Sequence, residues 1–143
     1  MSLKNCLFVT AIALLTLVLP TKAKAGDDGN CSNASLHGSY GLHATGKIIS
    51  VGADFAAVGR FTFDGKGNLT GRLFVRVNGS NNHLTITGTY WVDPDCTVSD
   101  VWRASNGTTT THKSVIVNEG KGYLILNDTV GDPSVISGEA TKQ

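Results

Sequence analysis

Two cysteines are the residues of this chain whose type and spacing suggest the most specific chemistry. Cys31 and Cys96 lie far apart, without the C-x-x-C spacing of a redox motif and without histidines in register to complete a zinc site. In an oxidising compartment, two such thiols most simply form one structural disulfide. We therefore predict a Cys31–Cys96 disulfide that ties the start of the domain to its middle.

Histidines and acidic residues are the next candidates, and they indicate no metal site. His37 and His43 can share one face of a predicted strand, but zinc ligands must lie about 2 Å from one ion and no third ligand is in register. The loop that starts at Asp64 places a lysine where a calcium loop needs an oxygen ligand. Asp93 and Asp95 flank a proline, and we interpret them as turn residues rather than as paired catalytic carboxylates.

Catalytic residues are not assigned by the sequence. His83 and His112 fall near the ends of predicted strands, and nothing in the sequence brings them to the first two histidines. The chain has no G-x-S-x-G nucleophile elbow and no glycine-rich loop that leads into a helix. We therefore expect no cofactor and no metal, and an enzyme is the less favoured interpretation.

The N-terminal 25 residues have the pattern of a secretory signal peptide. Lys4 supplies the positive charge, the run from Cys6 to Leu19 is uncharged, and Pro20 precedes an Ala-Lys-Ala cleavage site that ends at Ala25. The apolar run is shorter than the ~18–20 residues that a membrane-spanning helix needs. We predict cleavage after Ala25, a secreted or periplasmic protein, and no membrane span in the mature chain.

Composition limits the partners of the mature chain. Cleavage removes three lysines and changes the formal net charge from +1 to −2, which leaves no positive surface for nucleic acid or for an anionic membrane. The remaining length suits one domain. We therefore divide the chain into a signal peptide at 1–25, an N-terminal segment at 26–35 and a single domain at 36–143.

The rest of the chain alternates between apolar and polar residues, with turn signals at short intervals and no helical stripe. Asp64 to Asn68 is typical of a hairpin loop, and Asn106-Gly107 is the strongest short hairpin signal. The predicted strands cover residues 36–51, 55–63, 70–77, 84–92, 96–104, 108–117, 123–127 and 134–140.

Eight hairpin-linked strands close most economically into an antiparallel up-and-down barrel, because closure removes exposed strand edges. A two-sheet β-sandwich is the alternative, since alternation alone does not distinguish the two. The short connections argue against the crossovers of a sandwich. The expected fold class is therefore all-β, with an eight-stranded barrel.

Short motifs along the chain carry a resemblance. The segments Leu36–Tyr40, Phe61–Asn68, Gly88–Tyr90 and Asp95–Thr97 resemble a family of small exported bacterial β-proteins whose activity is uncharacterised. More distantly, Gly38-Ser39-Tyr40 is similar to the Gly-x-Trp that opens the lipocalin and avidin barrels of the calycin group, with tyrosine in place of tryptophan. The resemblance implies a barrel and carries no catalytic residue across.

The interior of an eight-stranded barrel is either just filled by side chains or wide enough for one small ligand. Val75, Val115 and Val117 are expected to face inwards, and Trp91 and Arg103 are candidates for the rim of a mouth. The candidate ligand-binding residues are Phe61, Phe63, Leu73, Ile86, Tyr90, Trp102 and Tyr123.

Three functions are consistent with this sequence. The first is an exported barrel that binds a small apolar molecule, and the second is a structural or surface-interaction domain without a ligand. The third, less favoured, is a barrel enzyme that resembles allene oxide cyclases or dirigent proteins. An interior pocket of about 300 Å³ or more, open at one end, favours the first function over the second. A buried Asp, Arg or His inside that pocket favours the third.

Overall fold

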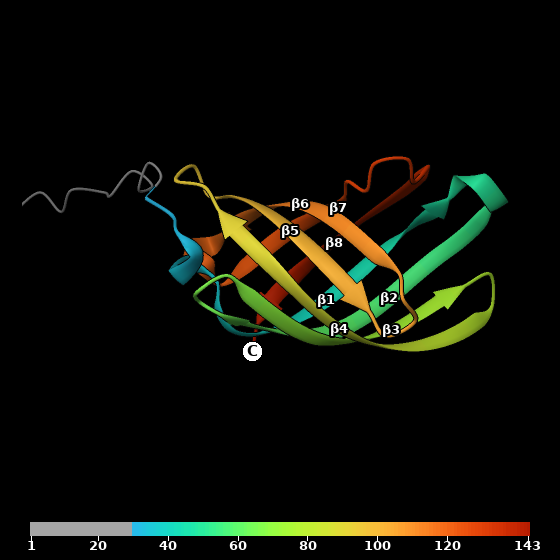
Figure 1. Ribbon diagram of the computed structural model, residues 1–143, viewed down its shortest axis with the longest axis horizontal. Helices are drawn as coiled ribbons and strands as arrows, with labels where there is room; N and C mark the ends of the chain where they lie inside the picture. The colour runs from blue at the N-terminus through green and yellow to red at the C-terminus, as the bar shows by residue number, and fades with distance from the viewer. Residues whose placement is uncertain (1–29) are drawn as a thin grey trace, which may run out of the picture.

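The computed structural model describes residues 30–143, so the predicted signal peptide lies outside the described residues. Eight antiparallel strands follow one another around a closed barrel (Figure 1). The predicted up-and-down barrel is confirmed, and the sandwich alternative is wrong. The strands are β1 (His37–Ile48), β2 (Ala53–Asp64), β3 (Asn68–Val77), β4 (Ser80–Val92), β5 (Thr97–Ala104), β6 (Thr109–Val117), β7 (Gly122–Asn127) and β8 (Ser134–Lys142).

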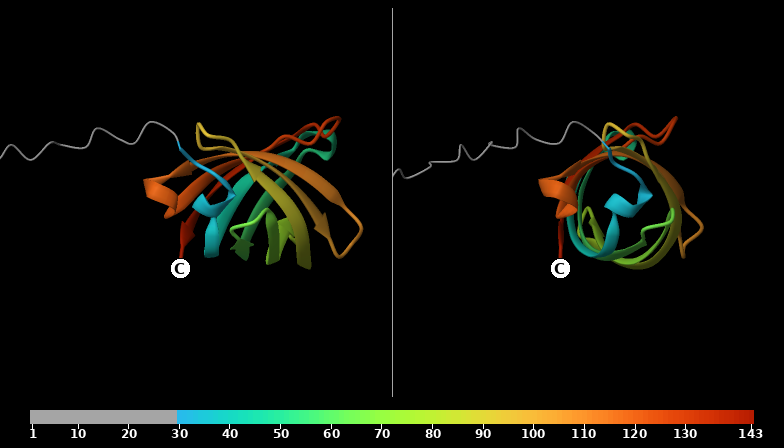
Figure 2. Two further views of the ribbon diagram at one scale, coloured as in Figure 1. Left: turned by 60° about the vertical axis from the view of Figure 1, so that its left-hand side comes forward. Right: turned by 90° about the vertical axis from the view of Figure 1, so that its left-hand side faces the viewer.

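Closure comes from pairing of the first strand with the last. β1 pairs with β8 from Tyr40 opposite Lys142 to Ile48 opposite Ser134, and every other strand pairs with its neighbour in sequence. The view along the barrel in Figure 2 (right) shows the resulting ring. Side chains alternate between the inside and the outside because a strand repeats every two residues. In β2, for example, Phe61 and Phe63 are buried and Thr62 is exposed.

Most strand boundaries lie within two residues of the prediction, and backbone geometry explains the two that differ by more. The first strand was expected to reach Val51, but β1 ends at Ile48 and a 3-10 turn over Ile49–Val51 precedes Gly52, whose φ is 63°. β4 begins at Ser80 rather than near Leu84. Asn78 and Gly79 both have positive φ, so this pair forms the tight hairpin turn without further residues.

One end of the barrel is closed by a short 3-10 turn, η1 (Asn33–Ser35), which lies across the opening in Figure 2 (right). The Tyr90 hydroxyl donates to the carbonyl oxygen of Leu36 over 2.9 Å, and the Tyr40 hydroxyl donates to the carbonyl oxygen of Gly120 over 2.6 Å. We call the ring cluster beneath this cap the aromatic plug. The aromatic plug consists of Tyr40, Phe63, Tyr90 and Tyr123.

The predicted disulfide between Cys31 and Cys96 is confirmed. It joins the segment before η1 to the turn that leads into β5, and the Cys31 amide also donates to the carbonyl oxygen of Pro94 over 3.2 Å. The disulfide therefore holds the cap against the closed end of the barrel.

The Asp64 carboxylate organises the loop between β2 and β3. Its Oδ1 accepts hydrogen bonds from the backbone amides of Lys66 and Asn68, over 2.7 and 2.9 Å, and its Oδ2 accepts one from the Asn68 side chain. The Asn68 side chain and these amides stabilise the charged form, and together they lower the pKa of Asp64 to about 2. The carboxylate thus caps a hairpin loop.

This geometry predicts a pH-dependent effect of Asp64→Ala on stability. The pKa of Asp64 is lower in the folded than in the unfolded chain, so its stabilisation is present above the unfolded value near 3.8 and is lost as the pH falls through about 2. We expect the variant to unfold at a lower temperature than wild type at pH 6, with a smaller difference at pH 2. The control is Asp54→Ala, which removes an exposed ion pair with Lys47. Equal differences at the two pH values would contradict this assignment.

Candidate ligand-binding cavity

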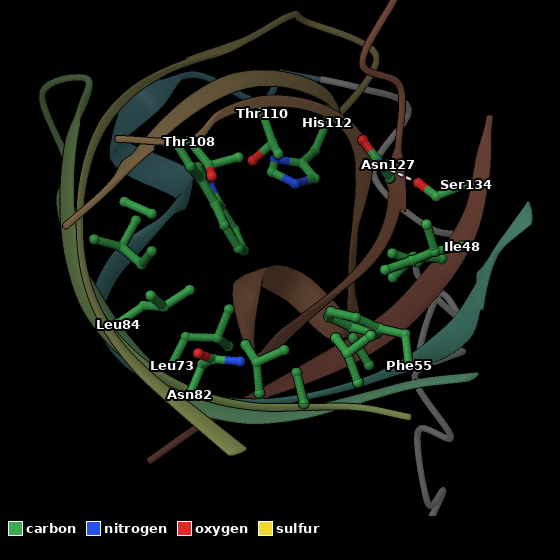
Figure 3. Close-up of a pocket in the computed structure, with 18 of the residues that line it drawn as sticks. Ile48, Phe55, Leu73, Asn82, Leu84, Thr108, Thr110, His112, Asn127 and Ser134 are labelled. Carbon is green, nitrogen blue, oxygen red and sulfur yellow. Dashed lines mark hydrogen bonds between the residues drawn. The ribbon is translucent and has the colours of Figure 1, made fainter. Parts of the chain in front are cut away.

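A cavity of about 350 Å³ lies in the half of the barrel away from the cap. Its walls come from the end of β1, the start of β2 and the corresponding ends of the other strands. Figure 3 shows the side chains around this lumen. The cavity has room because the residues that reach its middle from β1 and β2 are small, Ala44 and Ala57. A volume of this size lies within the range typical of small-molecule sites.

The cavity wall has two chemically different sides. Mainly apolar side chains from β1 to β4, including Ile48, Phe55 and Leu73, form one side, with Asn82 as a polar exception (Figure 3). Thr110 and His112 on β6 face the lumen from another side, followed by polar residues of the β7–β8 connection. A ligand in this cavity would therefore contact apolar groups along its body and polar groups along one edge.

A hydrogen-bonded cluster lies at the polar part of the mouth. The Asn127 side-chain amide donates to the Ser134 hydroxyl over 2.6 Å and to the Asp132 carboxylate over 2.9 Å. Burial acts to raise the pKa of Asp132, but the hydrogen bonds from Asn127 and Ser134 outweigh it and hold that pKa below its ordinary value. The mouth therefore carries a negative charge near neutral pH.

The structure divides the predicted ligand-binding residues between the cavity and the packed half of the barrel. Leu73, Ile86 and Trp102 line the cavity. Phe61 lies beneath it, with its ring stacked on that of Trp102 at 4.4 Å between centroids. The remaining three residues, Phe63, Tyr90 and Tyr123, belong to the aromatic plug. A direct ligand contact stays a prediction for all seven.

Several residues that were expected to face the interior or the mouth lie outside. Val115 is 45% exposed on the outer face of β6, and Trp91 is 62% exposed with its indole N–H donating to Asp93. Arg103 is also on the outer face. Val75 does line the cavity, whereas Val117 is only half-buried. The inward positions of β6 include His112, Ser114 and Ile116 instead, so the apolar pattern predicted the wrong face of this strand.

The buried pair Asp100 and His112 is the part of the site that sequence reasoning missed. They face each other across β5 and β6, and His112 Nδ1 lies 2.7 Å from Asp100 Oδ1. Burial raises the pKa of the Asp100 carboxyl, although its hydrogen bond with His112 acts in the opposite direction. The His112 ring lies 4.1 Å from that of Trp102, between centroids, and lines the cavity.

More polar atoms are buried beside this pair. Among residues 30–143, three buried side-chain polar atoms have no hydrogen-bond partner: Trp102 Nε1, the Ser114 hydroxyl oxygen and the Tyr123 hydroxyl oxygen. Burial and the nearby Asp100 charge raise the pKa of Tyr123, so its hydroxyl stays protonated. Native interiors hold few such unsatisfied atoms. The Trp102 ring lies beside that of His112, and Ser114 follows His112 by two residues on the same face of β6. The barrel interior next to the cavity therefore contains several polar groups.

No protein-family model and no curated protein matches this sequence. The fold is similar to designed β-barrels. The redesigned barrel mFAP1, solved bound to DFHBI, superposes with a TM-score of 0.55 at 12% identity, over 77% of this chain and 97% of that one. EF1p2_mFAP2b bound to DFHBI gives 0.56 at 10% identity, over 76% and 94%. A de novo designed fluorescence-activating β-barrel gives 0.53 at 13% identity, again over 76% and 94%.

Likeness at these identities shows the fold alone. An eight-stranded antiparallel barrel fits the calycin-like fold that Gly38-Ser39-Tyr40 implied, whereas the resemblance to exported bacterial proteins stays a prediction. Within the described part of the chain, no helix combines the length and apolar character needed to cross a bilayer.

Proposed function

We propose that this protein is exported and binds a small, largely apolar molecule in its barrel cavity. The observation that carries the proposal is the cavity of about 350 Å³, whose wall is apolar on one side and polar on the other. Small-molecule sites typically combine apolar walls with a few placed polar groups. The disulfide supports export, because such bonds persist in oxidising compartments.

The charges of the site favour a neutral ligand. Asp132 at the mouth is ionised, and Asp100 lies behind the wall next to His112. A ligand that carries a negative charge would have to lose its hydration beside these carboxylates, which is costly. A neutral molecule with a flat apolar body can instead lie against Trp102 and direct one polar group to β6.

The test uses Trp102 as an internal reporter. The chain has two tryptophans, so Trp91→Phe leaves Trp102 as the single indole, in the cavity wall. Titration with neutral N-phenyl-1-naphthylamine is expected to quench Trp102 fluorescence and to increase probe fluorescence with one site per chain. The matched anion 8-anilino-1-naphthalenesulfonate is expected to bind at least about tenfold more weakly, a difference of roughly 1.4 kcal/mol.

Two neighbouring alanines supply the control for this titration. Ala57 is buried and lines the cavity, whereas Ala56 lies on the outer face of the same strand. Ala57→Phe should fill the lumen and abolish probe binding, while Ala56→Phe should bind like the parent. Circular dichroism checks that the larger residue at 57 leaves the barrel folded. Absence of probe binding in the parent, or equal binding by both variants, would refute the proposal.

A surface-interaction domain without a ligand is the second candidate, and one observation favours it. Val115, Leu124 and Leu126 form an exposed apolar strip on the outer face of β6 and β7, where Val115 pairs with Leu124. Exposed apolar patches of sufficient size mark interaction sites. A folded protein that leaves the neutral probe unbound would favour this candidate over cavity binding.

A further inference from the structure

The Asp100–His112 pair leaves one ring nitrogen available to a bound molecule. His112 Nδ1 is engaged by Asp100 at 2.7 Å, so Nε2 is the remaining nitrogen. Figure 3 shows the His112 ring pointing into the lumen, and no protein group within residues 30–143 hydrogen-bonds to Nε2. A molecule in the cavity is therefore the natural partner of this nitrogen.

The position of Asp100 determines what Nε2 can do. An ionised Asp100 accepts the Nδ1–H of a neutral imidazole, which places the lone pair on Nε2. The same carboxylate stabilises the imidazolium that forms when Nε2 takes a proton, as in the Ser-His-Asp arrangement of hydrolases. Nε2 is thus an oriented base in a largely apolar cavity.

Stability alone does not account for the pair. Burying two ionisable groups is costly, and apolar side chains of similar volume are often as stable or more stable at such positions. Both residues are nevertheless nearly inaccessible to solvent, with side-chain exposures of 3% for Asp100 and 10% for His112.

Thr110 lies two residues before His112 on the same face of β6, and its side chain also reaches the lumen. The cavity therefore contains a base and a hydroxyl donor side by side.

We propose that the cavity catalyses proton transfer on neutral, flat, apolar compounds that carry a carbonyl group. His112 Nε2 takes a proton from the carbon next to the carbonyl. The electron pair of the broken C–H bond forms the carbon–carbon double bond of the enolate, and the π pair of the carbonyl moves to the oxygen. The Thr110 hydroxyl donates a hydrogen bond to the resulting enolate oxygen. The imidazolium then returns a proton to the same carbon or to a conjugated one, so the reaction is an exchange or an isomerisation and needs no co-reactant.

In this scheme His112 is the catalytic residue and Asp100 is a positioning residue. The inference rests on the proposed binding function, since the base acts only on a molecule held in the cavity.

Other titratable groups within the barrel keep one charge state between about pH 5 and 9. Burial raises the pKa of Tyr40, Tyr90 and Tyr123, whereas hydrogen bonds lower that of Asp132. A pH dependence of the reaction in this range therefore reports on the pair.

The experiment measures deuterium exchange at the carbons next to the carbonyl of 2-tetralone, a flat neutral ketone, by proton NMR in D₂O. Wild-type protein should accelerate exchange about 10²-fold over His112→Gln, the lower end of the range for general bases. The rate should be higher where Nε2 is unprotonated, because only then can Nε2 accept a proton from the substrate. Asp100→Asn should lose most of the acceleration and change the pH profile. His43→Gln removes an exposed histidine from the outer face of β1 and should exchange like wild type.

Binding and catalysis are separated by two further measurements. Trp102 quenching by 2-tetralone reports binding in each variant, and saturating N-phenyl-1-naphthylamine should suppress exchange by wild type. Wild-type protein that binds 2-tetralone without accelerating exchange, or His112→Gln that exchanges as fast as wild type, would overturn the catalytic inference. Binding of the naphthylamine but not of 2-tetralone would overturn the proposed substrate class. Binding of neither probe would refute the proposed function itself.

Discussion

Phe63→Ala is expected to lower the free energy of unfolding by about 3–5 kcal/mol, the range for truncating a buried aromatic residue. Phe63 is 2% exposed and lies at the centre of the aromatic plug. Its ring makes edge contacts with those of Tyr40, Tyr90 and Tyr123 at 5.0 to 5.6 Å between centroids. Truncation leaves a void that these rings cannot fill, because two of their hydroxyls are held by backbone carbonyls.

Urea denaturation followed by circular dichroism measures this loss. The matched control is Phe74→Ala, because Phe74 is 49% exposed on the outer face of β3 and packs edge-on against His83. We expect the control to lose less than about 1 kcal/mol, as is usual for surface positions. Similar losses for the two variants would contradict the description of Phe63 as the centre of the plug.

Removal of the disulfide by Cys31→Ser with Cys96→Ser is the second large expected effect. Closing a loop between residues 65 apart lowers the entropy of the unfolded chain, and the chain-entropy model gives about 4 kcal/mol for this length. The double variant should therefore unfold at a markedly lower denaturant concentration. The cap formed by η1 should loosen as well, since the disulfide holds the segment before it.

Reduction supplies an independent check of the same bond. Wild-type protein treated with dithiothreitol should unfold at the same urea concentration as the double variant, and the reductant should not affect the variant. Non-reducing peptide mapping should recover Cys31 linked to Cys96. Stability that is unchanged by both the substitutions and the reductant would show that this disulfide does not stabilise the fold.

These two predictions concern the closed end of the barrel, whereas the proposed chemistry lies in the cavity above the plug. The plug and the cap stabilise the fold through Phe63, Tyr40 and the disulfide. The cavity, in contrast, contains space and a buried ionisable pair, neither of which contributes to packing. The plug and the candidate site nevertheless adjoin, since Asp100 pairs with Tyr90 of the plug across β4 and β5.

The alternation of residues predicted most of the strands and most of their inward faces. Phe61, Phe63, Leu73 and Ile86 were all expected to point inwards, and they do. Glycine and asparagine at the turns separated one strand from the next. These features are local, since a strand face depends on every second residue and a tight turn on a few neighbouring ones.

The face of β6 could not be predicted in this way. Asn106-Gly107 is typical of a two-residue turn, which would place His112 opposite Val101. The connection is instead a loop of Ser105, Asn106 and Gly107, in which Gly107 has a φ of 87° and Ala104 bonds back to Thr108. This register places His112 opposite Asp100. A change of one residue in register moves every side chain of a strand to the other face.

The amino-acid sequence by itself determined the all-β class, the number of strands and the identity of most core residues, because local patterns set these features. Only the tertiary structure decided which core residues form a plug, which ones leave a cavity, and that Asp100 and His112 meet in its wall. Those outcomes depend on closure of β1 against β8 and on the stagger of strands that are distant in the chain. The space between side chains from different strands is a property of their packing and has no local signal.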